Sequence, residues 1–326
     1  MSVILLAQSG AAVRRTVQAL AAQTAVGRLE LVLVTASQAS LPPDRELLDA
    51  FAGHQVVEVG PVRSTAAARA EGIRAARAPI VALAEDHCFP EPGWAAALIE
   101  AHEAGWAAVG PEIANANPRT MLSWANLALE YGPWMAPEAS GERDHLPGHN
   151  SSYRRELLLA YGDRLEEMLE AESILQWDLR ERGHRLYQER RARTRHLNPS
   201  LLRPSLILRW HGGRLFAAAR SRRWSPLRRL LFTLASPAIP LVRTARVVRL
   251  LRERDELRHL FPRILPALAI VTTVDGLGEI RGYAFGLGDA IERTTEFEFE
   301  RAAKLTPEDR AEQDSDRAGE PVRVGV

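Results

Sequence analysis

The sequence predicts an α/β fold in which a mostly parallel sheet carries helices on both faces. Short apolar runs alternate with helical segments over about the first ninety residues, which is the pattern of strand–helix–strand units. The runs are brief, continuously apolar and bounded by turn residues, as expected for buried strands. With 326 residues, 46% of them hydrophobic and 25% charged, the chain is long enough to bury a sizeable core.

The apolar runs place the expected strands, and apolar residues at helical spacing place the helices between them. The predicted strands are residues 3–7, 29–34, 56–59, 80–84, 106–109 and 185–188. The predicted helices are residues 11–23, 47–51, 64–78, 92–105, 120–131, a segment beginning at 156, and 166–182. In the first of these helices, for example, Val13, Val17 and Leu20 recur on one face, and the Ala- and Arg-rich third helix ends at Pro79. Residues 133–144 are expected to form a loop.

Two carboxylates and an imidazole follow the strand at 80–84 directly, as Glu85, Asp86 and His87. In open α/β sheets, ligands bind beyond the carboxyl ends of the strands, which is where these groups fall. Glu, Asp and His side chains together can bind a divalent cation that holds a diphosphate. The alternative is a solvated acidic loop, because such loops are common on protein surfaces.

Composition and charge exclude some classes of protein. The net charge of +1 gives no sign of nucleic-acid binding by the molecule as a whole. Cys88 is the only cysteine, so no intramolecular disulfide can form and a reducing compartment is expected. The N-terminus lacks a basic segment and its apolar run is too short for a signal peptide, which indicates an intracellular catalytic portion.

Residues 203–263 differ from the rest of the chain, since fifteen arginines against three acids give this stretch a net charge of +12. The apolar runs at 230–242 and 264–274 are thirteen and eleven residues long, whereas a spanning helix needs about twenty. Arginine-flanked apolar segments of this kind fit helices that lie in the interface of an anionic leaflet. The alternative is a helical extension packed on the sheet domain with its arginines in water.

The domain boundaries follow from these shifts in composition. We expect a catalytic domain at 1–200, an arginine-rich, apolar helical region at 201–295 that associates with a membrane, and an acidic tail at 296–326. The tail has nine acids against five bases and few apolar residues, so disorder is expected near its end.

Three motifs in order resemble those of the family 2 glycosyltransferases, over about residues 2–196. The run 66–77 resembles the Ala-Arg-Asn-x-Gly-like helix of that family, and Glu85-Asp86-His87 stands where the family has Asp-x-Asp. The run 148–155 resembles the acceptor-side Gly-x-Asn-x-x-x-Arg-Arg segment. The resemblance implies a single Rossmann-like domain that binds a nucleotide sugar, with a C-terminal helical extension here.

The resemblance also implies a catalytic base on the helix that ends at Gly183. Counting back from Gly183 aligns Leu175 and Leu179 with the leucines of the family and puts Glu172 at the position of the base. The acid that precedes the base in the family is absent, because residue 171 is alanine. Glu170 and Asp178 are the alternatives, and a solvated acidic helix face is the structural explanation for all three.

Further site residues follow from the same alignment with the family. The donor-binding positions are Ala7, Thr35, Arg69, Glu85, Asp86 and Arg154, with Arg155 as an alternative to Arg154. His149 and Asn150 are expected on the acceptor side. An Asp commonly contacts the nucleotide base at the position of Thr35, so Thr35 and backbone groups are left to read the base here.

The metal ligands implied are Glu85, His87 and His196. Polypeptide N-acetylgalactosaminyltransferases, which the chain resembles at this point, also use a His in the Asp-x-Asp motif and a later His after the base helix. Two imidazoles with carboxylate and diphosphate oxygens suit Mn²⁺ at least as well as Mg²⁺. For His196 the alternative is one more basic residue in an arginine-rich loop.

The function implied is transfer of a sugar, with inversion, from a nucleotide-sugar donor to an acceptor hydroxyl, assisted by a divalent metal. The arginine-flanked C-terminal segments favour a glycan or lipid-linked acceptor, as in polysaccharide biosynthesis, at an anionic membrane surface. This places the enzyme on the cytoplasmic side of the inner (plasma) membrane, as a peripheral or monotopic protein. The alternative is a non-catalytic, membrane-bound binding or scaffold subunit that keeps the fold.

Overall fold

The computed structural model describes residues 1–41 and 45–314, and the chain forms two compact units. The first, called the sheet unit, consists of Met1–Ala116 and Glu138–His196 together with residues 311–314. The second, called the helical unit, consists of Asn117–Pro137 and Leu197–Arg310. Each unit is described on its own.

The sheet unit is built on a sheet of nine strands in the described chain. Eight of them follow the order β3-β2-β1-β4-β8-β6-β9-β5, and β7 pairs with β9. Their bounds are β1 Ser2–Leu6, β2 Glu30–Thr35, β3 Gly53–Glu58, β4 Ile80–Ala84, β5 Cys88–Pro90, β6 Ala108–Asn115, β7 Gly141–Arg143, β8 Ser152–Arg154 and β9 Leu186–His196. The α/β fold class predicted from the sequence is therefore confirmed.

The half of the sheet formed by β1 to β4 is parallel, as predicted. The other half is mixed, because β8 runs antiparallel to both β4 and β6, whereas β6 and β9 are parallel. In the parallel half, Leu6 pairs with Val34 and Leu5 with Ala84. The carboxyl ends of these strands therefore lie along one edge of the sheet, where a ligand is expected.

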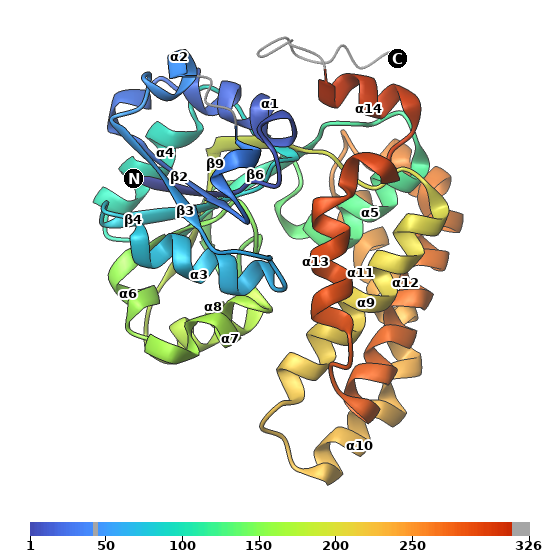
Figure 1. Ribbon diagram of the computed structural model, residues 1–326. Helices are drawn as coiled ribbons and strands as arrows, with labels where there is room; N and C mark the ends of the chain where they lie inside the picture. The colour runs from blue at the N-terminus through green and yellow to red at the C-terminus, as the bar shows by residue number, and fades with distance from the viewer. Residues whose placement is uncertain (42–44, 315–326) are drawn as a thin grey trace. The chain divides into compact units, whose positions relative to one another are not determined.

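Helices cover both faces of the sheet, as Figure 1 shows. The helix bounds are α1 Gly10–Ala21, α2 Arg45–Leu48, α3 Thr65–Ala75, α4 Trp94–Glu103, α6 Arg155–Leu159, α7 Leu165–Leu169 and α8 Glu172–Glu181. Alternate strand residues point to opposite faces. Thus Val3 and Leu5 pack into one core with α1 and α4, whereas Ile4 packs into the other with α3, α7 and α8.

The structure corrects several predicted elements. The helix expected at 166–182 breaks after Leu169, so α7 and α8 are separate and Glu172 opens α8. The strand expected at 185–188 extends to His196, and β5 was not expected. The loop expected at 133–144 contains β7, and the helix expected at 47–51 ends at Leu48.

The helical unit contains α5 and the helices that follow β9, as far as Arg310 within α14. Their bounds are α5 Met121–Tyr131, α9 Leu202–Ser221, α10 Pro226–Ala235, α11 Ile239–Glu253, α12 Phe261–Phe285, α13 Ala290–Phe299 and α14 Pro307–Asp314. The central pair is α9 and α12, which pack at very short distance through glycines. A Cβ on Gly213 of α9 would lie 2.3 Å from the carbonyl oxygen of Asp275, and one on Gly282 of α12 would lie 2.4 Å from that of Arg214.

Two segments of the helical unit are long and apolar enough to cross a membrane. Pro226–Glu253 contains an 18-residue stretch with a mean hydropathy of 1.2, and Arg258–Phe285 contains one with 1.4. Both exceed the apolar runs at 230–242 and 264–274, because the helices continue through prolines and charged residues. Length therefore does not exclude spanning, contrary to the prediction. Length and composition alone do not separate a membrane helix from the core helix of a soluble protein. Residues 315–326 of the expected acidic tail lie outside the described residues.

Candidate functional site

The segment Glu85-Asp86-His87 leaves the carboxyl end of β4 and is held by contacts to its backbone. The hydroxyl of Thr16 in α1 donates to the carbonyl oxygen of Asp86 over 2.9 Å. The side-chain amide of Asn150 donates to Glu85 Oε2 over 3.1 Å. The carboxylate of Glu85 is thus buried at the edge where the parallel strands end, with only 5% of the residue exposed.

Glu85, His87 and His196 come together into a buried group with ligand atoms within 4.8 Å of one another. Strand pairing explains how residues so far apart in sequence meet. The antiparallel register of β5 and β9 pairs Cys88 with His196, so His87 lies next to the end of β9. Nε2 of His87 and of His196 lie 3.4 and 3.5 Å from Glu85 Oε2, and the two rings meet edge to face with centroids 4.9 Å apart.

Asp86 orients the ring of His87 and is the most exposed residue of the motif. Its Oδ1 lies 2.7 Å from His87 Nδ1. When Nδ1 carries the proton, it donates to Asp86, and Nε2 then presents its lone pair toward Glu85 and His196. A carboxylate behind a ligating imidazole fixes the ring and raises its basicity toward a metal.

A second group joins this one through two cations. Arg69 of α3 reaches both carboxylates, with Nη1 3.1 Å from Glu172 Oε1 and Nη2 3.8 Å from Glu85 Oε1. His149 does the same from the other side, since Nδ1 lies 3.0 Å from Glu172 Oε1 and 3.6 Å from Glu85 Oε1. The predicted base and the predicted metal group therefore belong to one charge cluster, made of Arg69, His149, Glu85 and Glu172.

The backbone of residues 148–150 is shaped to fit this cluster. Gly148 lies so close to Glu172 that a Cβ there would be 2.9 Å from its Oε2, so a side chain would displace the carboxylate. Asn150 has φ of 67°, which is unusual for a residue other than glycine. Its backbone N–H donates to the carbonyl oxygen of Leu83 over 2.7 Å. These contacts fix the strained turn beside β4.

The charges of the cluster shift one another's pKa values. Burial raises the pKa of Glu85, but the imidazoles of His149, His87 and His196 outweigh burial and hold it well below its usual range. Burial likewise raises the pKa of Glu172, and His149 and Arg69 more than offset it. Burial lowers the pKa of His149, whereas the two carboxylates raise it to about 9. Both carboxylates are thus ionised at neutral pH, and His149 is an imidazolium.

Two of the predicted donor positions lie at the ends of neighbouring strands. Ala7 follows β1 and its N–H donates to the carbonyl oxygen of Val34 over 2.8 Å. Thr35 ends β2 and is fully buried, and its hydroxyl is 3.2 Å from the carbonyl oxygen of Ser37 and 3.3 Å from the hydroxyl of Ser40. The Thr35 side chain is therefore engaged with its own loop.

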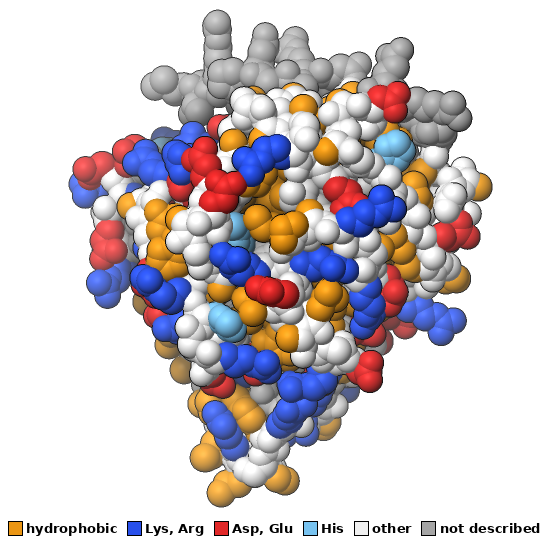
Figure 2. Space-filling view, turned by 90° about the vertical axis from the view of Figure 1, so that its left-hand side faces the viewer, with side chains coloured by type: hydrophobic (Ala, Val, Ile, Leu, Met, Phe, Trp, Pro, Cys, Tyr) orange, Lys and Arg blue, Asp and Glu red, His pale blue; other side chains and the backbone are white. Residues whose placement is uncertain are grey.

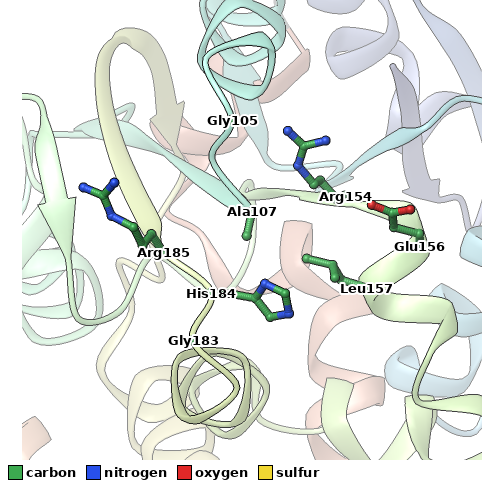
Figure 3. A pocket seen from close by; sticks show the side chains of 8 residues that line it. All are labelled: Gly105, Ala107, Arg154, Glu156, Leu157, Gly183, His184 and Arg185. Carbon is green, nitrogen blue, oxygen red and sulfur yellow. The ribbon is translucent and has the colours of Figure 1, made fainter.

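Arg154 and Arg155 are not brought to the charge cluster. Arg154 pairs with Ile80 at the amino end of β4, the opposite end from Glu85. Its guanidinium donates to the carbonyl oxygens of His102 and Trp106, beside a surface hollow of about 280 Å³ (Figure 3). Arg155 donates to the carbonyl oxygens of Ile73 and Arg74 at the end of α3.

Glu170 and Asp178, the alternatives to Glu172 as the base, do not share the surroundings of Glu172. Glu170 follows α7, outside the first turn of α8. Asp178 accepts a hydrogen bond from the hydroxyl of Tyr161 over 2.6 Å and forms an ion pair with Arg182, also over 2.6 Å. Six residues after Glu172 on the same helix, it points about 120° away around the axis.

Two residues that hold the site were not anticipated from the sequence. Thr16 fixes the backbone after β4, and nothing in the sequence of α1 marks it. Gln176, one turn after Glu172, accepts from the N–H of Leu146 over 2.7 Å and donates to the hydroxyl of Tyr153 over 2.9 Å. A glutamine on the buried face of a helix that also carries Leu175 and Leu179 is a signal that sequence inspection could have used.

Comparison with known proteins gives one family and several structures. The family model described as glycosyltransferase like family 2 matches residues 2–213. No curated protein matches the chain. Among solved structures, GalNAc-T7 with UDP, GalNAc and Mn²⁺ is 14% identical, with a TM-score of 0.43 over 60% of this chain and 43% of that one.

Two structures of S. aureus TarS are also similar to the chain. One is 15% identical, with a TM-score of 0.43 over 86% of this chain and 54% of that chain. The second, in complex with UDP, is 16% identical, with the same TM-score over 83% and 89% of the two chains. The chain thus spans about half the length of the first two structures that it matches.

Proposed function

Because the chain belongs to the glycosyltransferase-like family 2, we propose that it moves a sugar from a nucleoside diphosphate sugar to an acceptor hydroxyl, with inversion and with a divalent metal. The observation that carries the proposal is the buried charge cluster. It joins a group with the chemistry of a metal site, Glu85, His87 and His196, to a carboxylate outside that group, Glu172.

The donor set of the first group fits a divalent cation. Two imidazole nitrogens and a carboxylate oxygen are the ligands that Mn²⁺ and similar ions accept, and all three residues are buried. Glu85, His87 and His196 would hold the ion, and Asp86 would orient His87. A bound ion would supply Lewis-acid stabilisation of the departing diphosphate.

The reaction needs a base for the acceptor. In a single displacement, the acceptor oxygen attacks the anomeric carbon while the bond from that carbon to the diphosphate oxygen breaks, and the electron pair of that bond leaves with the diphosphate. The acceptor proton must go to a carboxylate on the attacking side, and Glu172 is our assignment. Its lowered pKa keeps it ionised, hence able to accept the proton, and Arg69 fixes its position.

The structure supports a chemical class for the donor and for the acceptor, but not one particular sugar or nucleotide. Thr35 stands where the family commonly has an acid and is engaged with its own loop, so backbone groups at the end of β2 are left to contact the nucleotide base. We propose a glycan or lipid-linked acceptor, received on the side of His149 and Asn150, and a location on the cytoplasmic face of the inner membrane. The exposed apolar helices and the +12 charge of residues 203–263 support this.

The test is release of nucleoside diphosphate from a panel of nucleotide sugars, with Mn²⁺ present or after chelation. We expect turnover of one donor class that depends on Mn²⁺. Glu172→Gln should reduce that turnover by about 10²–10⁴-fold, the range for loss of a general base. Glu170→Gln is the matched control, two residues away in sequence, and should keep activity within about twofold.

Two results would overturn the assignments. Unchanged transfer by Glu172→Gln would remove Glu172 as the base. No turnover of any donor by the wild-type protein would favour a non-catalytic binding or scaffold subunit.

A further inference from the structure

Helix α10 is rich in leucine and its leucines are exposed, whereas Arg229, Phe232 and Thr233 are half-buried. None of its residues is buried. Four large apolar side chains lie open to solvent: Leu227 (67% exposed), Leu230 (54%), Leu231 (57%) and Leu234 (69%). They recur at spacings of three and four residues, so they form one face of the helix. A folded protein rarely leaves such a face uncovered unless it binds something there.

The apolar face continues a short way into α11, through Leu241 and Val242. From Leu227 to Val242 the rise is about 22 Å, at 1.5 Å per residue. That is shorter than the roughly 30 Å hydrocarbon core of a bilayer. The exposed apolar surface therefore suits a helix that lies in the interface of a membrane, not one that crosses it.

The charge around this face has one sign. Arg222, Arg223, Arg228 and Arg229 precede or open α10, and no Asp or Glu occurs between Glu189 and Glu253. Figure 2 shows orange apolar side chains interleaved with blue basic ones at the bottom of the view, the end where Figure 1 places α10. A surface of this kind complements anionic headgroups.

Aromatic residues lie beside these arginines, as they do at membrane interfaces. Trp224 stacks on Tyr283 with centroids 5.7 Å apart, and the Arg228 guanidinium lies 4.2 Å from the centre of the Trp224 ring. Phe285, at the end of α12, is 68% exposed under the guanidinium of Arg281.

We propose that α10 docks the helical unit onto the surface of an anionic phospholipid bilayer. The leucine face enters the interface and the arginines contact phosphate and other anionic headgroups. This rests on the membrane association proposed above and names the element that carries it. A second copy of the chain is a poorer occupant, because two such faces would bring arginines against arginines, and residues 190–252 contain no acid to pair with them.

The test is co-sedimentation of the full chain with phosphatidylcholine vesicles that contain or lack phosphatidylglycerol. The wild type should bind the anionic vesicles, weakly at high salt, and bind the neutral ones far less. Leu230→Gln/Leu234→Gln should lower the partition coefficient at least roughly tenfold. The control is Leu202→Gln/Ile207→Gln, which changes two exposed apolar residues of α9 and should bind like the wild type. Circular dichroism establishes that both variants fold.

Three outcomes would overturn the proposal: equal binding by the α10 variant and its control, retention of the chain in the membrane after alkaline extraction, which indicates spanning, or a dimer in solution that only the α10 variant loses. Donor turnover measured on the same proteins without vesicles separates this proposal from the catalytic one. Failed turnover with intact vesicle binding removes only the enzyme assignment, and the reverse result removes only the docking surface.

Discussion

At the scale of single residues, the four charges of the cluster are paired with one another. Each cation, Arg69 and His149, contacts both carboxylates, Glu85 and Glu172. Buried charges of this kind are tolerated only when paired, because an unpaired one forfeits its hydration without compensation. Arg69 therefore holds both carboxylates in position. The donor contact expected for it from the sequence stays a prediction.

Replacing Arg69 should destabilise the protein. Arg69→Met leaves two carboxylates in a buried site with His149 as their shared cation, and removal of one partner from a buried pair costs about 3 kcal/mol or more. We expect a loss of about 3 kcal/mol in the free energy of unfolding, measured by urea denaturation. Arg74→Met in the same helix is the control, since its pair with Glu71 is half exposed and should change stability by less than about 0.5 kcal/mol. Equal midpoints for the two variants would contradict the role of Arg69.

The residues of the candidate metal group could be chosen from the sequence because chemistry and order along the chain identify them. Glu85 and His87 follow an apolar strand, and His196 follows α8 in a place similar to that of the later His that the family resemblance implies. The place of Arg154 could not be predicted, because it depends on the direction of β8. That strand runs antiparallel to β4 and carries Arg154 to the opposite end from Glu85.

At the scale of elements, β9 explains why His196 lies beside His87, as expected, and why the sequence did not predict the full length of the strand. Its second half, Glu189 to His196, is mostly charged, so no apolar pattern marks it as a strand. Its charges are satisfied within the sheet unit instead: Arg193 donates to the buried Glu112 over 2.6 Å, and Arg191 contacts Glu189. Partners that are distant in sequence override local propensity here, and the same pairing brings His196 beside His87.

Two adjacent glycines of α9, Gly212 and Gly213, allow the packing of α9 on α12 to be tested, with Gly212 as the control. Gly213→Ala puts a methyl group 2.3 Å from the carbonyl oxygen of Asp275 and must push α9 from α12, which should cost about 1–3 kcal/mol. At Gly212 an added Cβ meets nothing within 4 Å. Gly212→Ala should therefore stabilise the helical unit by about 0.5–1 kcal/mol, through helix propensity alone. Urea denaturation followed by circular dichroism measures both, and shifts of the same sign would contradict this packing.

At the scale of the whole molecule, net charge conceals how charge is distributed. The total of +1 combines +12 in residues 203–263 with −11 elsewhere. The net charge of the whole chain therefore does not indicate an anionic partner, whereas the net charge of residues 203–263 does. The fold also decides whether an apolar helix is buried or exposed to solvent. The sequence of α10 alone therefore could not predict that its leucines are exposed.

The stability of the whole molecule should depend on pH through a buried histidine outside the charge cluster. His102 is 2% exposed; its Nδ1 lies 3.1 Å from the carbonyl oxygen of Trp106 and its Nε2 lies 2.9 Å from the hydroxyl of Ser152. Burial and, to a lesser extent, the charge of nearby Arg154 lower the pKa of His102 to about 4, although the hydrogen bond with the carbonyl oxygen of Trp106 opposes them. The folded protein thus holds this ring neutral at pH values where the unfolded chain protonates it.

The sign follows from proton binding. Between pH 6.5 and 4 the unfolded state binds the His102 proton and the folded state does not, so this contribution to stability falls as pH falls through that window. A difference of about 2.5 pKa units corresponds to about 3 kcal/mol. His102→Gln keeps a donor and an acceptor but cannot titrate, so its free energy of unfolding should approach or exceed that of the wild type at pH 4 while falling below it at pH 7. His54→Gln, at an exposed position, should run parallel to the wild type. Parallel curves for His102→Gln would mean that His102 binds its proton equally in the folded and the unfolded protein, which would contradict the effect of burial.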